Sequence, residues 1–225
     1  HPIEHHLEKL NIGNERYLAT YDGITYNPHK IKLPSGFRIR CLGIWREYLV
    51  MGVTRGTNIT DYDQGYLFFW DGIHTTYNFY LPVPEGAINA IMSGDPMYFV
   101  AVYSGDLMKY EGGIPKKIRR LPKVDHATTL EVNRKAISMW KALVHIGIAE
   151  NSTSTTIERG VYSYGTLAPE VSPTLSFDYP LSLGVTTGAT LEIGALIPMG
   201  SSLLISWRNG TSYGVDEVDP TASPF

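Results

Sequence analysis

The chain has 225 residues, of which 43% are hydrophobic and 18% charged, and its formal net charge is −3. This is the composition of an ordinary soluble globular protein, and it provides no long-range attraction for nucleic acid or anionic lipid. No apolar run approaches the roughly 18 residues that a membrane-spanning helix needs, so neither nucleic acid nor a membrane is an expected partner.

The chain begins with HPIEHHLEKLNIGN, residues 1–14, which has neither the basic nor the apolar region of a secretion signal. We expect this stretch to be a lead-in segment unrelated to the rest of the chain, with a short turn of helix over 5–11. The histidines at its start are interpreted as a solvated end and not as metal ligands. Because the chain does not start with Met, we interpret it as a processed product or as part of something longer.

From residue 15 onwards a short aromatic stretch that ends in glycine recurs at intervals of roughly 40 to 53 residues. Its copies are TYDG, FWDG, KYEG, YSYG and TSYG, and they end at Gly23, Gly72, Gly112, Gly165 and Gly214. A period of this length with strand-like contents is typical of the blades of a β-propeller. The carboxylates before the first three glycines, Asp22, Asp71 and Glu111, are interpreted as turn residues.

A second series lies upstream of each glycine and consists of short, dense apolar runs. They are YLVMGV (48–53), MYFVAV (97–102), LVHIGI (143–148) and SLLISW (202–207). Such runs are typical of strands that are buried on both faces. Their fifth positions are all small, namely Gly52, Ala101, Gly147 and Ser206, which predicts a site close to a neighbouring blade.

The two series predict an all-β fold, a β-propeller of four-stranded antiparallel blades. Each blade has an inner strand, the dense apolar strand, the aromatic strand and an outer strand. About four to five blades are visible: an outer hairpin at 15–35, blades at 36–86, 87–123 and 135–182, and a partial blade at 190–225. Either the two ends complete one shared blade, or both are cut edges of a larger propeller, and we favour the second.

In such blades the loops between the second and third strands, and those between blades, emerge on the same side. Here they are long, polar and rich in threonine, at 54–65, 124–134, 149–158 and 183–192. Loops carry function more often than the scaffold does, so this side is the candidate recognition face, unless the loops merely tolerate length. The candidate interaction residues are Thr57, Asn58, Thr60, Asp61, Asp63, Thr128, Asn151, Thr153, Thr155, Thr186 and Thr187.

The residue patterns give no support for catalysis. The inner strands CLGIW, INAIM, AISMW and GALIP contain no Asp or Glu, whereas a propeller glycosidase needs convergent carboxylates there. The chain also lacks G-x-S-x-G, a Walker loop and a Cys–His pair. We predict that the protein is not an enzyme and that it needs no cofactor.

Other chemistry-bearing residues have plain structural interpretations. DYDQG (61–65) begins like a calcium loop but lacks the remaining ligands, so no metal site is predicted. Cys41, the single cysteine, is expected to be a buried thiol, and His145 a satisfied core imidazole. The basic outer strand at 116–123 is interpreted as an edge strand protected against stray pairing, in preference to a phosphate site.

Three stretches of the C-terminal half resemble repeats of structural proteins from tailed bacteriophages. They are ERGVYSYG (158–165), SFDYPLSLG (176–184) and LLISWRNGTSYGVDEVD (203–219). The resemblance covers about residues 135–219 and, less closely, YLFFWDG (66–72). Its motifs are architectural, so it implies fold and context without active-site residues, and no tail-tube or baseplate domain accompanies them.

The resemblance implies a non-enzymatic virion structural protein in or at the phage tail. Its expected partners are other virion proteins and further copies of itself. The alternative is an extracellular, lectin-like propeller whose aromatic residues stack on a host glycan, and the same blades would also fit a cellular scaffold.

Overall fold

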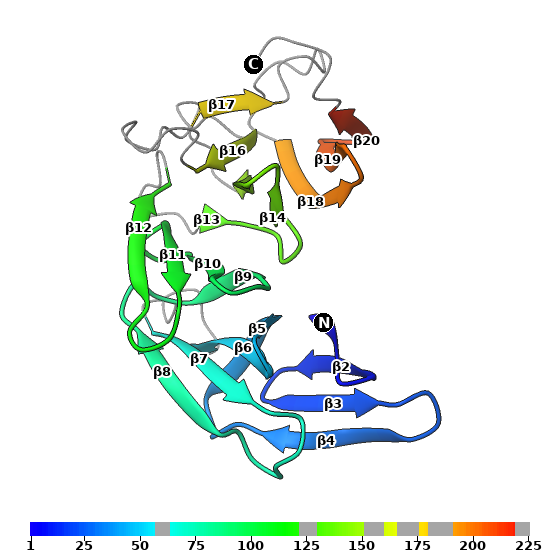
Figure 1. The fold of residues 1–225 in the computed structure, drawn as a ribbon, viewed down its shortest axis with the longest axis vertical. Coiled ribbons are helices and arrows are strands. Elements are labelled where there is room, and N and C mark those ends of the chain that lie inside the picture. Colours follow the sequence, from blue (N-terminus) through cyan, green and yellow to red (C-terminus); the bar gives the residue numbers. More distant parts are fainter. Residues whose placement is uncertain (57–63, 122–129, 151–159, 166–175, 180–190, 219–225) are drawn as a thin grey trace. The chain divides into compact units, whose positions relative to one another are not determined.

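The computed structural model of the chain describes residues 1–56, 64–121, 130–150, 160–165, 176–179 and 191–218. In these ranges the chain forms five antiparallel β-sheets and no helix (Figure 1), which confirms the all-β prediction. The chain divides into two compact units, His1–Leu121 and Pro122–Phe225.

The first unit contains three sheets, each a meander of four strands in which neighbours along the chain pair with one another. Sheet 1 consists of β1 (Ile3–His6), β2 (Lys9–Asn14), β3 (Tyr17–Tyr21) and β4 (Tyr26–Lys32). Sheet 2 consists of β5 (Phe37–Trp45), β6 (Tyr48–Arg55), β7 (Gly65–Trp70) and β8 (Phe79–Val83). Sheet 3 consists of β9 (Ile88–Met92), β10 (Met97–Ala101), β11 (Asp106–Tyr110) and β12 (Lys116–Arg120).

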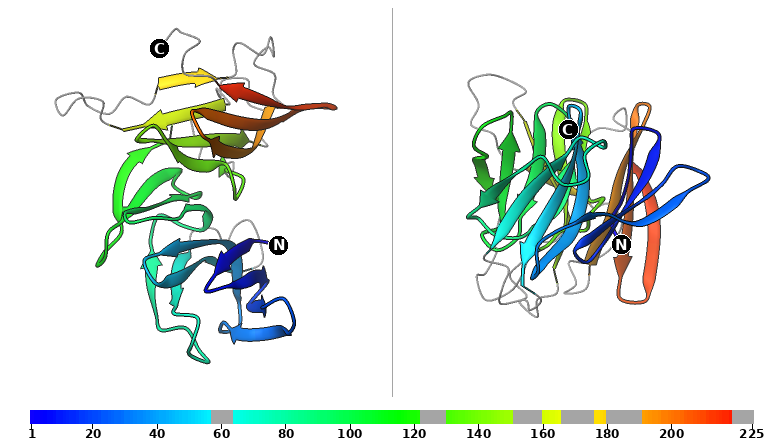
Figure 2. Two further views of the ribbon diagram at one scale, coloured as in Figure 1. Left: turned by 45° about the vertical axis from the view of Figure 1, so that its right-hand side comes forward. Right: turned by 90° about the horizontal axis from the view of Figure 1, so that it is seen from below.

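The second unit contains two sheets with the same kind of local pairing, which the two views of Figure 2 show from other sides. Sheet 4 runs β13 (Leu130–Glu131), β15 (Leu143–Glu150), β16 (Gly160–Tyr164) and β17 (Ser176–Tyr179), and β14 (Ile137–Trp140) also pairs with β15. Sheet 5 contains β18 (Leu191–Met199), β19 (Ser202–Asn209) and β20 (Ser212–Val218). The dense apolar runs of the sequence are β6, β10, β15 and β19, the second strand of each repeat.

The expected lead-in segment, residues 1–14, is part of the repeat and not unrelated to it. β1 and β2 form a tight hairpin through Leu7 and Glu8, which adopt φ of 48° and 59°, and β2 pairs with β3. The helical turn expected over 5–11 is therefore wrong. The stretch escaped recognition because its apolar residues alternate with polar ones, which is typical of a strand with only one face covered.

The core of the first unit lies between its sheets. Leu18 and Ile31 of sheet 1 pack with Met51, Phe68 and Trp70 of sheet 2 in one cluster. The opposite face of sheet 2 packs on sheet 3 in a second cluster, which joins Cys41, Val50, Leu67 and Phe69 to Ile88, Phe99 and Met108. We call the face that a sheet turns to the following sheet its leading face, and the opposite one its trailing face.

Contacts between a leading and a trailing face share one feature, an isoleucine that sits on a glycine. A Cβ added to Gly52 would lie 2.9 Å from the Cγ2 of Ile88 on the next sheet. Gly147 has the same relationship with Ile193, and a Cβ on Gly13 would lie 2.8 Å from the Cγ2 of Ile39. Gly13 is thus a further member of the small-residue series that the sequence pattern did not reveal. Ala101 is not a member, because it lies in the cluster that faces sheet 2, and Val100 has the register of Gly52.

Candidate recognition surfaces

The loop face expected from the sequence cannot be compared with the structure, because its eleven residues lie outside the described ranges. These residues are Thr57, Asn58, Thr60, Asp61, Asp63, Thr128, Asn151, Thr153, Thr155, Thr186 and Thr187. In the first unit the turns at the opposite ends of the strands are described, and two of them carry organised polar groups.

The turn between third and fourth strands is built in the same way in sheets 1 and 2. The Oδ1 of Asp22 accepts hydrogen bonds from the backbone N–H groups of Ile24 (3.0 Å) and Thr25 (2.7 Å). The Oδ1 of Asp71 accepts from the N–H groups of Ile73 (2.9 Å) and His74 (3.0 Å). This confirms that these carboxylates are turn residues, since each satisfies backbone groups two and three positions ahead.

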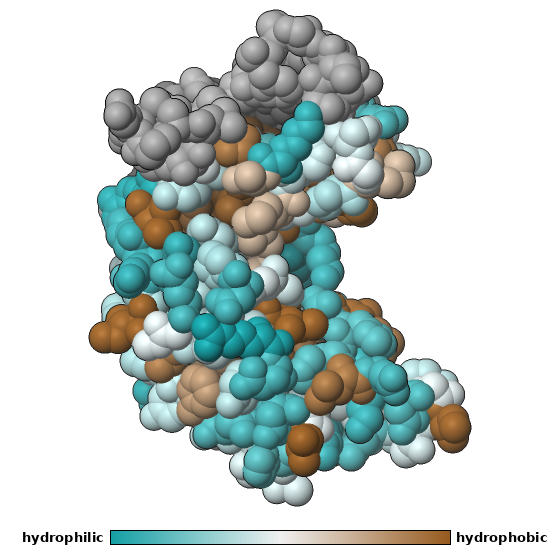
Figure 3. Space-filling view, in the orientation of Figure 1, coloured by the Kyte–Doolittle hydropathy of each residue, from teal (hydrophilic) through white to brown (hydrophobic). Residues whose placement is uncertain are grey.

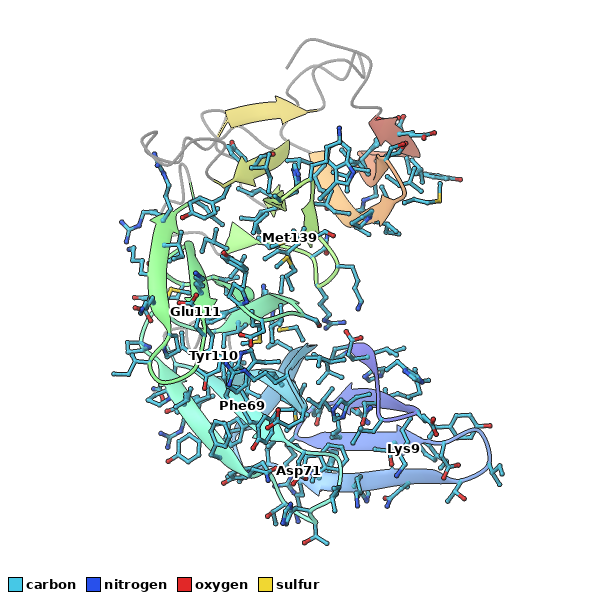
Figure 4. All side chains as sticks on the ribbon, viewed as in Figure 1. Lys9, Phe69, Asp71, Tyr110, Glu111 and Met139 are labelled. Carbon is cyan, nitrogen blue, oxygen red and sulfur yellow. The ribbon has the colours of Figure 1, made fainter. Side chains whose placement is uncertain are left out.

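The second of these turns also holds a small polar cluster, near the label of Asp71 in Figure 4. The Oδ2 of Asp71 accepts from the Nδ2 of Asn78 at 3.0 Å and contacts the Nδ1 of His74. Desolvation alone would raise the pKa of Asp71, but the hydrogen bonds from Asn78, His74 and Ile73 outweigh it and hold this pKa well below its usual range. Asp71 is therefore a fixed charge that organises the turn.

An isoleucine projects from the tip of each of these turns in the first unit. Ile24 follows Asp22 and Gly23, Ile73 follows Asp71 and Gly72, and Ile114 follows Gly112 and Gly113; all three isoleucines are more than three-quarters exposed. Figure 3 shows separate brown spots on a mostly teal surface over this unit, and isolated apolar residues of this kind are common on soluble proteins. The repeated Asp-Gly-Ile triplet is the sequence signal for the first two turns.

Aromatic side chains gather on the outer strands of sheet 2. Phe68 and Tyr80 stack at 5.3 Å between ring centroids, and Tyr77 meets the edge of Phe68 at 4.8 Å. Tyr80 keeps about half of its surface exposed. A flat, half-exposed tyrosine on a rigid aromatic base is the kind of group on which an apolar ring face can stack.

Two basic side chains of the edge strand β12 form ion pairs within sheet 3. The Nζ of Lys117 lies 2.8 Å from the Oδ2 of Asp106, and the Nε of Arg120 lies 3.6 Å from its Oδ1. The side chain of Asp106 is almost completely buried. These two cations therefore stabilise an internal carboxylate, which agrees with a structural role for the strand.

The inner strands bring polar groups together at one described point. The Nε of Arg40 donates to the Oδ1 of Asn89 at 3.0 Å, from the irregular position of β5 to that of β9. Beyond the expected core segments, β1 carries Glu4 and β18 begins with Glu192, whose Oε1 accepts from Arg208 at 2.9 Å. Within the described inner strands, these contacts do not form the convergent carboxylate pair that glycoside hydrolysis requires.

The two internal groups singled out from the sequence have the expected surroundings. Cys41 is fully buried, and its Sγ lies 3.3 Å from the carbonyl of Ile88. The Nε2 of His145 donates to the carbonyl of Trp140 (3.2 Å), so its Nδ1 accepts from the hydroxyl of Ser163 (2.7 Å). Burial lowers the pKa of His145, and the bond to Trp140 only partly offsets this.

No protein family matches the chain, and no curated protein is significantly similar to it. Similar solved structures exist, with low identity. The extracellular domain of a hybrid two-component system from B. thetaiotaomicron is 17% identical with a TM-score of 0.61, over 98% of this chain and 26% of that one. The extracellular domain of a one-component system from the same organism is 18% identical, with a TM-score of 0.46 over 99% of this chain and 32% of that one.

A prolyl endopeptidase structure is 7% identical, with a TM-score of 0.41 over 100% of this chain and 42% of that one. Only the first neighbour has a TM-score above 0.5, and at 17% identity it shows a similarity of fold alone. The chain spans about a quarter of the length of that neighbour. No helix in the described ranges is long and apolar enough to cross a membrane, and no group of His, Cys, Asp and Glu there is suited to a metal ion.

Proposed function

We propose that the five sheets are blades of a β-propeller and that the protein is a non-enzymatic scaffold of a virion, associated with the tail, which holds neighbouring proteins. The observation that carries the propeller is the repeated interlock of a small second-strand residue with an isoleucine of the next sheet, at Gly13, Gly52 and Gly147. Stacked, sequence-local sheets of this kind form extended surfaces for partners. The phage-like motifs of the C-terminal half supply the context.

The scaffold role is supported by what the described polar groups do. Asp71, Asp106 and His145 are each engaged in holding a turn, a strand or the core, and the inner strands lack a pair of acid and base groups in the described ranges. The shifted pKa values of Asp71 and His145 are thus accounted for by structural contacts, and these two residues lie on different sheets and do not form one reaction centre.

The test of this proposal is the composition of purified particles. Peptides of the chain should remain with particles through a density gradient, and their ratio to the major structural proteins should be constant across the peak. Quantitative mass spectrometry of the fractions measures this ratio. Peptides that appear only in the soluble fraction would contradict a virion role.

A second candidate, recognition of a glycan, is favoured by the half-exposed stack of Tyr80 on Phe68. An extracellular location would accompany it, as for the extracellular domain that is similar in fold. Titration with saccharides should then give binding that Tyr80→Ala weakens about tenfold or more, whereas Tyr213→Ala in the other unit has no effect. Absence of saturable binding across a panel of saccharides would remove this candidate.

A further inference from the structure

The inner strands of sheets 2 and 3 each contain a β-bulge, a residue that has no paired residue on the neighbouring strand. In β5 the register shifts between Ile39 and Cys41, which leaves Arg40 without a pairing position on β6. In β9 the register shifts around Asn89, which has no pairing position on β10. A bulge bends its strand and aims a side chain differently from those of the regular ladder, and bulges are frequent beside functional sites.

The two bulge side chains meet across the contact between the sheets. The Nε of Arg40 donates to the Oδ1 of Asn89 at 3.0 Å. A guanidinium group has donors and no acceptor, so the amide oxygen must face Arg40 and the Nδ2 must point away from this bond. The position of the amide donors therefore follows from the chemistry of the pair.

The amide of Asn89 has a donor group without a protein partner. Asn89 is only 8% exposed, and within the part of the chain that the structure describes its Nδ2 makes no hydrogen bond. Polar groups that are buried to this extent are almost always hydrogen-bonded, to protein, to water or to a ligand. The unused Nδ2 donor therefore indicates a place for an acceptor next to Arg40.

A second arginine of sheet 2 shows what is unusual about this pair. Arg46, in the β5–β6 turn, also reaches sheet 3, and its Nε lies 2.8 Å from the Oδ2 of Asp95 in the β9–β10 turn. Asp95 compensates the charge of Arg46, whereas the amide of Asn89 does not compensate the charge of Arg40. A contact that served only to join the two sheets would be stronger with a carboxylate, because charge-assisted hydrogen bonds are roughly twice as strong as neutral ones.

The charges along β5 favour an anion as the acceptor. Arg38 lies two residues before Arg40, and its Nη2 is 3.6 Å from the Oε1 of Glu15. This carboxylate is thus engaged with Arg38, and the three side chains together carry a net positive charge. An approaching anion is attracted by such a charge, and the planar guanidinium suits the oxygens of a carboxylate or a phosphate group.

We propose that Arg40 and Asn89 form a binding site for an oxyanion, a carboxylate or a phosphate group, at the inner strands of sheets 2 and 3. The guanidinium of Arg40 supplies the charge, and the Nδ2 of Asn89 supplies a neighbouring donor. The site lies on inner strands, apart from the tyrosine stack on the outer strands of sheet 2. It goes beyond the scaffold function and does not depend on a virion role.

The experiment titrates the parent with inorganic phosphate and, separately, with acetate, at an ionic strength kept constant with sodium chloride. Amide-correlation NMR spectra report on the side-chain NH₂ group of Asn89. Its resonances should shift and saturate. In Arg40→Gln the apparent Kd should rise about tenfold or more, because a neutral amide replaces the charged donor. Glutamine retains an N–H donor for Asn89, so the contact between the sheets can persist.

Two further variants separate binding from structure. Arg46→Gln is the matched control, because it removes an arginine that joins the same two sheets, and it should leave the titration unchanged. Asn89→Asp places a carboxylate next to Arg40 and should abolish the response of the Arg40 Nε–H resonance to either anion. The melting temperature of Asn89→Asp should equal or exceed that of the parent, since the new pair is charged.

The relative responses to the two anions identify the source of the oxyanion. A stronger response to phosphate assigns the site to a phosphate group, and a stronger response to acetate assigns it to a carboxylate, such as an acidic side chain. The proposal is overturned by shifts that sodium chloride alone reproduces, by the absence of saturation with both anions, or by a response that persists in Arg40→Gln or in Asn89→Asp. None of these results depends on the composition of particles.

Discussion

Gly147 of β15 packs directly against the side chain of Ile193 of β18. The Cβ of Ala136 is also close: a Cβ added to Gly147 would lie 3.2 Å from it. The backbone N–H of Gly147 donates to the carbonyl of Ala136 at 2.7 Å, and this hydrogen bond holds β15 against the chain segment that leads into β14. A larger side chain at 147 would have to displace either the isoleucine or the hydrogen-bonded inner strand.

We expect Gly147→Leu to lower the free energy of unfolding by about 1–3 kcal/mol or more, because it overpacks the contact between sheets 4 and 5. Thermal or urea denaturation measures the change. Ile193→Ala in the same chain should restore part of the loss by making room, which a purely conformational effect of replacing glycine would not allow.

The control is Val215→Leu on β20, where the side chain is 64% exposed. This change should alter stability by less than about 0.5 kcal/mol, as for most exposed substitutions. A Gly147→Leu variant that unfolds with the parent would mean that the second strands are not equivalent.

Asp71→Asn tests the charge that organises the β7–β8 turn. The pKa of Asp71 is lowered in the folded chain, so its stabilisation is present above the ordinary value of about 4 and is lost as the pH falls toward the lowered value. Parent and variant should therefore differ in melting temperature near pH 7, and the difference should shrink progressively as the pH falls below about 4. Asp22→Asn, with fewer hydrogen bonds to its carboxylate, should show the same trend with a smaller difference.

His145→Gln tests the buried imidazole of sheet 4. Burial lowers the pKa of His145, so the folded chain binds this proton less readily than the unfolded chain does. The contribution of His145 is present above the ordinary pKa of about 6.5 and is lost as the pH falls from there. Between pH 7 and pH 5, stability should decline less steeply in the variant than in the parent; equal slopes would contradict the assignment.

Lys117→Met tests the partner of the buried carboxylate of Asp106. Removing the ammonium group leaves Asp106 with the more distant Arg120, at 3.6 Å, and we expect a loss of about 1–3 kcal/mol in the free energy of unfolding. Lys116→Met, on the same strand, should change it by less than about 0.5 kcal/mol. Equal effects of the two variants would show that the charge of the strand matters and not this pair.

Periodic patterns predicted most of the strands because β-sheet formation here is local. The dense apolar runs reflect burial. Gly23, Gly72 and Gly112 follow the third strands of sheets 1 to 3 and adopt the positive φ that their turns require. The prediction is wrong for Gly214, which lies within β20 and pairs with Trp207. Sheet 1 was missed at residues 1–14 because its second strand buries the polar residue Asn11 at the position where sheet 2 buries Val50, so the strand contains no dense apolar run.

The candidate surfaces were less predictable than the fold. The exposed face around Val215 looks like an ordinary aromatic strand in the sequence, since only the packing of the next sheet distinguishes a buried position from an exposed one. The pairing of Arg40 with Asn89 depends on irregular positions in two inner strands, which no local pattern reveals. The Asp-Gly-Ile turns were visible in the sequence as turns, but the projection of their isoleucines was not.

The local pairing of the strands also bears on how the protein emerges from the ribosome. Sheet 1 has all of its strand partners once residue 32 has been synthesised, and sheet 2 has all of its own by residue 83. Each sheet can thus form its hydrogen bonds during translation without waiting for distant segments, which favours rapid folding. The leading face of each sheet stays exposed until the next sheet has been synthesised, and exposed apolar surface is prone to aggregation. A pause in translation is therefore more harmful just before a sheet–sheet contact forms than after it.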